Sequence, residues 1–196
     1  MNTSVIRFVN TDDFADAQAI LDIYAPYILN SDITFECTVP TRDEFAERIL
    51  HYTEQFPYLV YEIGGVPVGY AYATKQRERE AYMWNAETSV YVQEKYQRSG
   101  IAKKLYTVLL NILALQGYKT AYACITYPND KSVAFHKKSG FKETSVFHNT
   151  GFKLGKWRDT IWLEKQLGNY EPDPAPPTPF CKLDKNSLYS MIDSIV

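Results

Sequence analysis

Cysteine and histidine are scarce in this chain of 196 residues, which contains three of each. The cysteines are widely separated and odd in number, which argues against a disulfide framework and favours reduced thiols in the cytoplasm. The histidines are also far apart, so none of them has the spacing of metal ligands. We therefore expect a cytoplasmic protein without a metal site.

Long apolar runs and an excess of charge are missing too. No apolar stretch approaches the ~20 residues of a membrane-spanning helix. The formal net charge is only −2, so nothing global points to nucleic acid or to an anionic membrane as a partner. Hydrophobic residues make up 45% of the chain and aromatic residues 15%, which is enough for the core of one globular domain.

Strand-like and helix-like segments alternate over residues 1–168. Runs with strand character are residues 5–9, 58–63, 66–73, 87–92, 119–127, 141–148 and 158–167. Helical periodicity or capping signals mark residues 13–29, 41–55, 101–116 and about 129–139. This alternation, with hairpins at both ends, predicts an α/β domain with a mixed sheet.

The composition changes after Gly168. Five of the ten prolines lie between Pro172 and Pro179, so this segment should be extended and without regular hydrogen bonding of its own. Residues 188–196 could form one short helix. We interpret residues 169–196 as a proline-rich C-terminal tail on a domain of residues 1–168.

The segment "QRSGIA", residues 97–102, joins a strand-like run to a strongly amphipathic helix. Gly100 lets the backbone approach a ligand closely, and the unpaired N–H groups of a helix start attract anions. Lys103 and Lys104 in the first helical turn oppose the helix dipole, which a bound anion would offset. A solvated turn with exposed lysines explains the same residues, and the turn alone does not decide between the two.

The segment resembles the Gln/Arg-x-x-Gly-x-Gly/Ala motif of the GNAT superfamily of N-acetyltransferases, in which this loop holds the pyrophosphate of acetyl-coenzyme A. Ala102 stands where many relatives have glycine. The resemblance to phosphinothricin acetyltransferases of that superfamily covers roughly residues 5–167. Five more segments match, and all occur in the order seen in phosphinothricin acetyltransferases: "TFE" (34–36), "REREAYMWNAETSVYV" (77–92), "PND" with Ser132, "FHKKSGF" and "GFKLGKWRDTIW" (151–162).

This resemblance implies a single GNAT-like α/β domain, with a mixed, mostly antiparallel sheet flanked by helices, and acetyl-CoA as co-substrate. It also implies a homodimer, which the abundance of Tyr and Trp would suit. The implied coenzyme-binding residues are Val90, Tyr91, Val92, Gln97, Arg98, Ser99, Gly100, Ile101, Ala102, Lys103, Asn129 and Ser132.

Two residues are implied to be catalytic. Glu87 matches the glutamate that acts as general base in the family, often through water; the alternative is an exposed glutamate at a strand end. His136 stands where many GNAT enzymes have tyrosine, and it could act as acid, base or acceptor contact. The alternative for His136 is a buried, hydrogen-bonded structural histidine.

The implied acceptor is a small amino-acid-like amine, contacted by Phe35, Arg79, Tyr82 and, as a weaker candidate, Tyr106. Our main interpretation is an N-acetyltransferase that moves the acetyl group of acetyl-CoA to such an amine by direct attack in a ternary complex. A GNAT enzyme for another amine, such as a protein N-terminus or an antibiotic, is one alternative. A noncatalytic module that binds acyl-CoA is the other.

Overall fold

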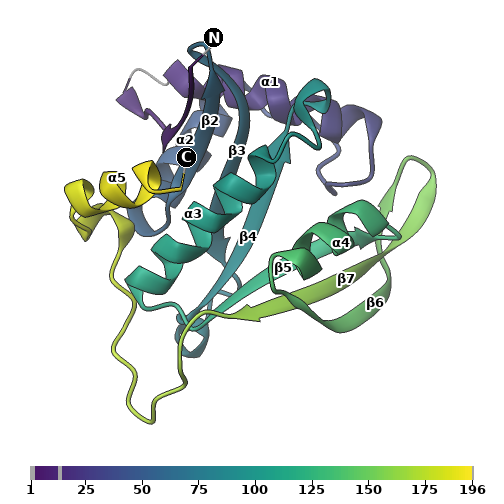
Figure 1. Ribbon diagram of the computed structural model, residues 1–196. Coiled ribbons are helices and arrows are strands. Elements are labelled where there is room, and N and C mark those ends of the chain that lie inside the picture. The colour runs from purple at the N-terminus through teal and green to yellow at the C-terminus, as the bar shows by residue number, and fades with distance from the viewer. Residues whose placement is uncertain (1–2, 13–14, 196) are drawn as a thin grey trace.

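Within residues 3–12 and 15–195, which the computed structural model describes, the strand-like runs form one seven-stranded sheet (Figure 1). Its order is β1-β2-β3-β4-β5-β7-β6, and every neighbouring pair is antiparallel except β4 with β5. The strands are β1 (Ser4–Phe8), β2 (Tyr58–Ile63), β3 (Val66–Lys75), β4 (Asn85–Val92), β5 (Thr120–Tyr127), β6 (Lys142–Lys153) and β7 (Lys156–Gln166). The predicted α/β domain with a mixed, mostly antiparallel sheet is confirmed.

Helices cover both faces of this sheet (Figure 1). They are α1 (Ala15–Asn30), α2 (Arg42–Gln55), α3 (Ile101–Gln116), α4 (Asp130–Lys138) and α5 (Lys185–Asp193), with short 3₁₀ turns η2 (Glu80–Tyr82), η3 (Glu94–Tyr96) and η4 (Phe180–Lys182). Local sequence explains several helix ends. Thr41 and Glu44 form the expected capping box of α2, and Gly117 ends α3 in a left-handed conformation. Residues 13 and 14, where the first helix was expected to begin, lie outside the described residues.

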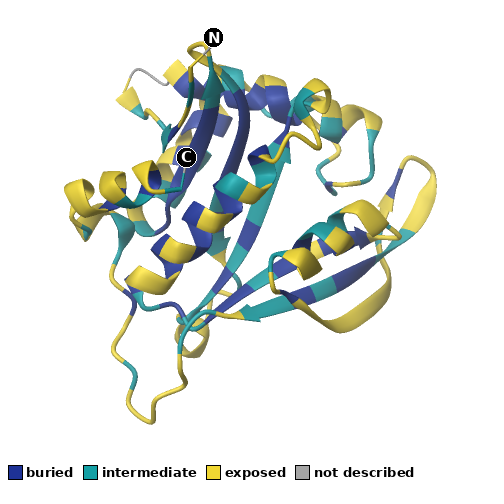
Figure 2. Cartoon of the chain, viewed as in Figure 1, coloured by how far each residue is buried: buried dark blue, intermediate teal, exposed yellow. Residues whose placement is uncertain are grey.

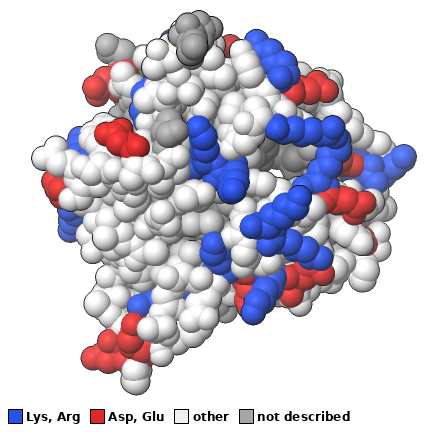
Figure 3. Space-filling model, viewed as in Figure 1, with Lys and Arg blue, Asp and Glu red and all other residues white. Residues whose placement is uncertain are grey.

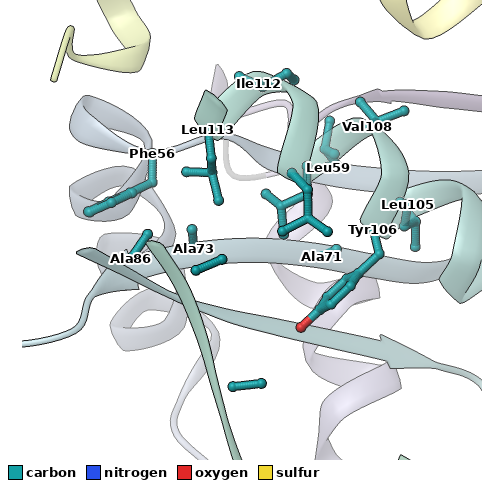
Figure 4. Packing of buried hydrophobic residues seen from close by; sticks show 14 of the residues in the cluster. Phe56, Leu59, Ala71, Ala73, Ala86, Leu105, Tyr106, Val108, Ile112 and Leu113 are labelled. Atoms are coloured by element: carbon teal, nitrogen blue, oxygen red, sulfur yellow. The ribbon is translucent and has the colours of Figure 1, made fainter. Parts of the chain in front are cut away.

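The sheet separates two hydrophobic clusters (Figure 2). On one face, α3 packs Leu105 and Leu113 onto small residues of β3 and β4, among them Ala73 and Ala86 (Figure 4). On the other face, α1 and α2 cover a cluster rich in tyrosine. Because side chains alternate along a strand, Ala86 faces α3, whereas Glu87 faces α1 and α2.

The last two strands are longer than expected from the sequence. The predicted strands ended at residue 148 and resumed at 158, but β6 and β7 form a hairpin that continues to a turn at Leu154 and Gly155. Both turn residues have positive φ, +52° and +73°, and the register shifts between Phe147 and Gly151. Irregular pairing of this kind obscures the period of two that identifies a strand in a sequence.

The C-terminal segment runs along the domain before it forms α5 beside α3 and β1 (Figure 1). Leu188 and Ile192 of α5 are 1% and 2% exposed and belong to the cluster on the α3 face. The helix begins earlier than the sequence indicated, because Asp184 caps it through the N–H of Ser187.

Candidate active site

The parallel strands β4 and β5 part directly after Glu87. They share three register pairs, from Asn85 with Thr120 to Glu87 with Tyr122. Beyond this point the strands diverge, and β4 continues to Val92 paired with β3 alone (Figure 1). The C-terminal half of β4 therefore has one edge that no strand covers.

The backbone of Val90 faces this open edge. The N–H of Gln93 bonds to the carbonyl of Val68 in β3 at 2.9 Å. Because bonding residues alternate in an antiparallel ladder, the N–H and C=O groups of residues 88, 90 and 92 then point away from β3. They are available to a ligand that lies along β4 like an added strand.

Side chains already occupy both ends of the open edge. The Tyr106 hydroxyl oxygen lies 3.3 Å from the carbonyl oxygen of Thr88, and the Tyr27 hydroxyl donates to the carbonyl of Val92 at 2.5 Å. Val90 lies between these two points, and no strand neighbour reaches it on that side. Its backbone is therefore the natural anchor for a ligand in the gap.

The start of α3 lies just beyond the end of β4. Gly100 precedes the helix with φ of +88°, and the first intrahelical bond runs from the Lys104 N–H to the Gly100 carbonyl at 3.1 Å. The N–H groups of residues 101–103 consequently have no acceptor within the helix. A Cβ built on Gly100 meets no atom within 4 Å, so the space beside it is open. An anion can approach these donors closely.

Basic and polar side chains surround this loop. Lys95, Arg98 and Lys103 are exposed, and Figure 3 shows Lys and Arg side chains along the gap between α3 and α4. Arg98 has a positive φ of +63°, and Gln97 donates from Nε2 to the Tyr27 hydroxyl at 3.1 Å. Ser99 donates to the carbonyl of Tyr96 at 2.5 Å, which braces the turn. The local field is therefore positive although the chain as a whole is slightly acidic.

Glu87 is half-buried at the point where the strands part. Burial raises the pKa of its carboxyl group above the ordinary 4.5, because the charged form loses hydration. Burial also raises the pKa of the Tyr52 and Tyr106 hydroxyls, and the charge of Glu87 adds to both shifts. A carboxylate in this setting is a better proton acceptor than an exposed one.

His136 is only 5% exposed and is hydrogen-bonded through both ring nitrogens. Nδ1 lies 2.8 Å from the carbonyl of Ser132, which can only accept, so Nδ1 carries the proton of the neutral ring. Nε2 then accepts from the Tyr106 hydroxyl at 2.9 Å. Burial lowers the pKa of His136 below the ordinary 6.5, partly offset by the bond to Ser132. The ring is therefore neutral at pH 7.

A chain of hydrogen bonds links His136 to the parting of the strands. The Tyr106 hydroxyl is also 2.9 Å from Thr88 Oγ1, and the single Thr88 hydroxyl proton can go to the Tyr106 oxygen or to the carbonyl of Tyr122, each at 2.9 Å. Tyr106 is 1% exposed on α3 and lies in the core, as Figure 4 shows. The sequence suggested Tyr106 as a contact for the acceptor, whereas its hydroxyl bonds His136 and Thr88.

The start of α4 lies across the gap from α3. Asn129 caps α4 by accepting from the Ser132 N–H at 3.2 Å, as expected from the sequence. Because the side-chain oxygen Oδ1 of Asn129 accepts this bond, the helix fixes the orientation of the Asn129 side-chain amide. Asn129 and Ser132 are both half-buried.

The expected acceptor contacts fall into two separate places. Arg79 and Tyr82 line a cavity of about 260 Å³ at one end of the sheet, where Arg77 stacks over the Tyr82 ring at 5.7 Å. Phe35 instead lies on the loop after α1, against Gly151 of the β6–β7 hairpin. A Cβ added to Gly151 would be 2.4 Å from the Phe35 ring, so the two are in close contact.

Sequence reasoning missed an ion pair on the Glu87 face of the sheet. Arg48 of α2 bonds Glu36 at 2.5 Å, and both side chains are 34% exposed. Charges on Arg48, Glu36 and Glu87 all act on the pKa of the Tyr52 hydroxyl, so the four residues are close together. Arg48 and Tyr52 are four residues apart on α2, so helical spacing could have predicted that they are neighbours. The pairing of Arg48 with Glu36 depends on tertiary structure and could not be predicted in this way.

Comparison with known families matches residues 6–162 to the acetyltransferase (GNAT) domain. The chain belongs to the GNAT acetyltransferase family. The matched region contains β4, the loop before α3, and His136, and it ends before the C-terminal segment.

Curated relatives of this GNAT protein act on small amino-acid-like compounds. It is 36% identical over 165 residues to a phosphinothricin N-acetyltransferase of Streptomyces viridochromogenes, covering 84% of this chain and 88% of that one. It is 31% identical to an L-methionine sulfoximine/L-methionine sulfone acetyltransferase of Salmonella typhimurium, covering 84% and 95%.

The fold agrees with solved GNAT structures. A phosphinothricin acetyltransferase from Sinorhizobium meliloti, crystallised in complex with AcCoA, superposes with a TM-score of 0.82 at 31% identity. The match covers 91% of this chain and 98% of that one.

The lowered pKa of His136 predicts a pH-dependent stability. Between that pKa and about 6.5 the unfolded chain binds a proton that the folded GNAT domain does not, so the unfolding free energy falls as pH falls. The slope is at most about 1.4 kcal/mol per pH unit for one proton. In His136→Gln this contribution is gone, so its deficit relative to wild type should shrink from pH 7.5 to 5.5 in urea denaturation.

Val133→Ala is the matched control, because Val133 is buried on the same helix and does not titrate. Its deficit should be the same at every pH. Parallel stability curves for wild type and His136→Gln would contradict the prediction.

Proposed function

We propose that this GNAT protein transfers the acetyl group of acetyl-CoA to the amine of a small amino-acid-like acceptor, by direct attack in a ternary complex. The observation that carries the proposal is the parting of β4 and β5 after Glu87. It leaves the backbone of Val90 open to the donor and puts a half-buried carboxylate beside it. Relatives named for phosphinothricin, methionine sulfoximine and methionine sulfone support the acceptor class.

The residues around the gap fit acetyl-CoA. Three N–H donors at the start of α3, open space beside Gly100 and a rim of basic side chains suit its pyrophosphate. The loop and helix residues Gln97 to Lys103 would hold this part. The backbone of Val90, Tyr91 and Val92 would hold the pantetheine arm, with Asn129 and Ser132 across the gap.

Glu87 is proposed as the general base, directly or through one water. It would take a proton from the acceptor ammonium, so that the free amine can attack the thioester carbonyl carbon. The Val90 N–H would stabilise negative charge that develops on the carbonyl oxygen. The C–S bond then breaks, and the departing thiolate needs one proton.

We propose that the Tyr106 hydroxyl gives its proton to the thiolate and recovers one from the nitrogen of the tetrahedral intermediate, which still carries one proton more than the amide product; His136 positions this hydroxyl. His136 does not face the gap itself, but its hydrogen bonds run through Tyr106 to Thr88, next to Glu87. A neutral His136 that accepts from Tyr106 fixes the position of the hydroxyl there. On the acceptor side, Arg79 and Tyr82 are proposed contacts, and Phe35 borders the same face of the sheet from the opposite end.

Two alternatives lead to different results in a substrate screen. Acetylation of peptides or antibiotics in preference to free amino acids would favour a GNAT enzyme for another amine. Binding of acetyl-CoA without turnover on any amine would favour a noncatalytic module. The half-buried Glu87 at the open edge supports catalysis over mere binding.

Gly100→Val should weaken acetyl-CoA binding by about tenfold or more, because a β-branched side chain enters the space in front of the helix N–H groups. Calorimetry on folded protein measures the change. Gly155→Val is the matched control: Gly155 also has positive φ and open space, but it lies in the β6–β7 turn. Equal affinities in both variants would show that the pyrophosphate lies elsewhere.

Glu87→Gln should keep the fold and acetyl-CoA affinity but lower turnover by about 10²–10⁴-fold, since shape is kept and the proton-accepting charge is lost. The loss should be largest for acceptors of high amine pKa, which are hardest to deprotonate. In wild type, the acidic limb of the rate profile should lie above pH 4.5, because burial raises the pKa of Glu87, and the variant should lack this limb.

His136→Ala provides the contrast for the assignment of the base. Its loss of turnover should be similar for acceptors of different amine pKa. If Glu87→Gln is nearly silent and His136→Ala shows the steep dependence on amine pKa, the roles of the two residues must be exchanged.

A homodimer is proposed as the working form. Large side chains on the β6–β7 hairpin are exposed, with Phe147 at 49%, Phe152 at 58% and Trp157 at 61%, and such surfaces suit an interface. Sedimentation should give a mass of about 45 kDa, which is twice the chain mass of 22.6 kDa. Phe152→Ser combined with Trp157→Ser should shift the equilibrium to the monomer; a wild-type monomer at all concentrations would refute the proposal.

A cytoplasmic location is proposed as well. Cys37, Cys124 and Cys181 are free and exposed, which suits a reducing compartment. Cell fractionation checks this location, and recovery with secreted proteins would contradict it.

A further inference from the structure

The cavity that contains Arg79 and Tyr82 reaches β4 at Asn85, whose side chain is on the same face of the strand as that of Glu87. Asn85 lines this cavity and precedes Glu87 by two residues. Residues two apart on a strand share a face and are about 6.6–6.8 Å apart. An acceptor whose amine is at Glu87 can therefore extend its other end into the cavity.

A second hollow of about 370 Å³ supports this connection. It is lined by Tyr52 of α2 and by Thr74, the register partner of Glu87 in β3. It shares Gln55, Phe56 and Lys75 with the first cavity. The two hollows therefore adjoin, and they extend from Thr74, the residue paired with Glu87, to the loop of residues 76–84.

The C-terminal segment forms one wall of the first cavity. Pro176 and Pro177 line it together with Arg77 and Arg79. Pro177 is buried, and its Cα is 3.8 Å from the Cβ position of Gly117. A pair of prolines has few accessible conformations, so this wall is stiff as well as apolar.

Specific hydrogen bonds hold this wall in place. Trp84 donates from Nε1 to the carbonyl of Ala175 at 2.9 Å, which ties the segment to the end of the 76–84 loop. Gln116 donates from Nε2 to the carbonyl of Thr178 at 2.8 Å, and the Thr178 N–H returns a bond of 2.8 Å to the Gln116 carbonyl. These contacts fix residues 175–178 on the domain.

Arginine gives the cavity its chemistry. None of the ion pairs within residues 3–12 and 15–195 includes Arg77 or Arg79. Arg77 stacks on Tyr82, which leaves the donors of its guanidinium group open. Glu78 and Glu80 line the cavity too, but Lys75 pairs with Glu78 at 3.3 Å, so two arginines remain against one carboxylate and suit an anionic or strongly polar group on a short stem.

We propose that residues 175–178 of the C-terminal segment are a specificity element of the acceptor site. They wall the cavity and, through Trp84, hold the loop that presents Arg79 and Tyr82. The acceptor they fit carries an acidic or sulfone-like end a few bonds from its amine. This inference rests on the proposed function, because it needs the amine at Glu87.

Trp84→Phe tests the proposal, since it removes the bond to Ala175 and keeps an aromatic ring. With L-methionine sulfone as acceptor, KM for the acceptor should rise about 3–10-fold, the effect of one lost hydrogen bond. The value of kcat and KM for acetyl-CoA should not change. A merely structural role would lower the active fraction and kcat without this selective rise in the acceptor KM.

Pro177→Ala is the second variant and loosens the wall without disturbing Trp84. It should raise the acceptor KM in the same selective way. Glu171→Gln is the matched control, because it breaks the Lys119–Glu171 ion pair in the same segment but does not line the cavity. Its acceptor KM should equal that of wild type.

The outcomes separate this inference from the proposed function. If wild type acetylates L-methionine sulfone and both Trp84→Phe and Pro177→Ala keep its acceptor KM, the specificity element is refuted. A rise in KM for all three variants, Glu171→Gln included, would also refute it, because general loosening would explain the result. If wild type acetylates no small amine at all, the proposed function itself fails.

Discussion

The early end of the β4–β5 ladder is the constraint on which the site depends. A strand in the middle of a sheet normally has both edges bonded, and buried N–H and C=O groups without partners are costly. After Glu87, β4 keeps its bonds to β3 and loses those to β5. The rest of the domain must therefore either supply other partners or leave room for a ligand.

Tyrosine hydroxyls supply those partners at both ends of the open edge. The Tyr106 hydroxyl from α3 lies 3.3 Å from the Thr88 carbonyl, and the Tyr27 hydroxyl from α1 donates to the Val92 carbonyl. The Thr88 hydroxyl lies 2.9 Å from the carbonyl of Tyr122 in β5, so a side chain continues the link between the strands after the ladder has ended. Only the backbone of Val90 is left between them, which limits a ligand to one position along β4.

Local signals in the sequence predicted the parts of the site that depend on neighbouring residues. The capping box at Thr41, the cap at Asn129 and the glycine before α3 each act within four residues of their partners. The Tyr27–Val92 bond joins residues 65 positions apart, and Phe35 meets Gly151 of a hairpin that is distant in the sequence. Such contacts are set by tertiary packing, and neither hydrophobic periodicity nor helix-capping signals in the sequence predict them.

Burial acts in opposite directions on the two titratable groups at this site, and the chemistry follows from that difference. It disfavours the charged form in each case, so it raises the pKa of Glu87 and lowers that of His136. Raising the pKa makes a carboxylate more basic, while a neutral imidazole can accept from Tyr106 without an added proton. One physical cause thus suits the two groups to different roles: the raised pKa suits the half-buried carboxylate to the base role proposed for it, and the buried neutral ring accepts from the Tyr106 hydroxyl. The two properties, a raised carboxyl pKa and a neutral imidazole, therefore both depend on how deeply Glu87 and His136 are buried.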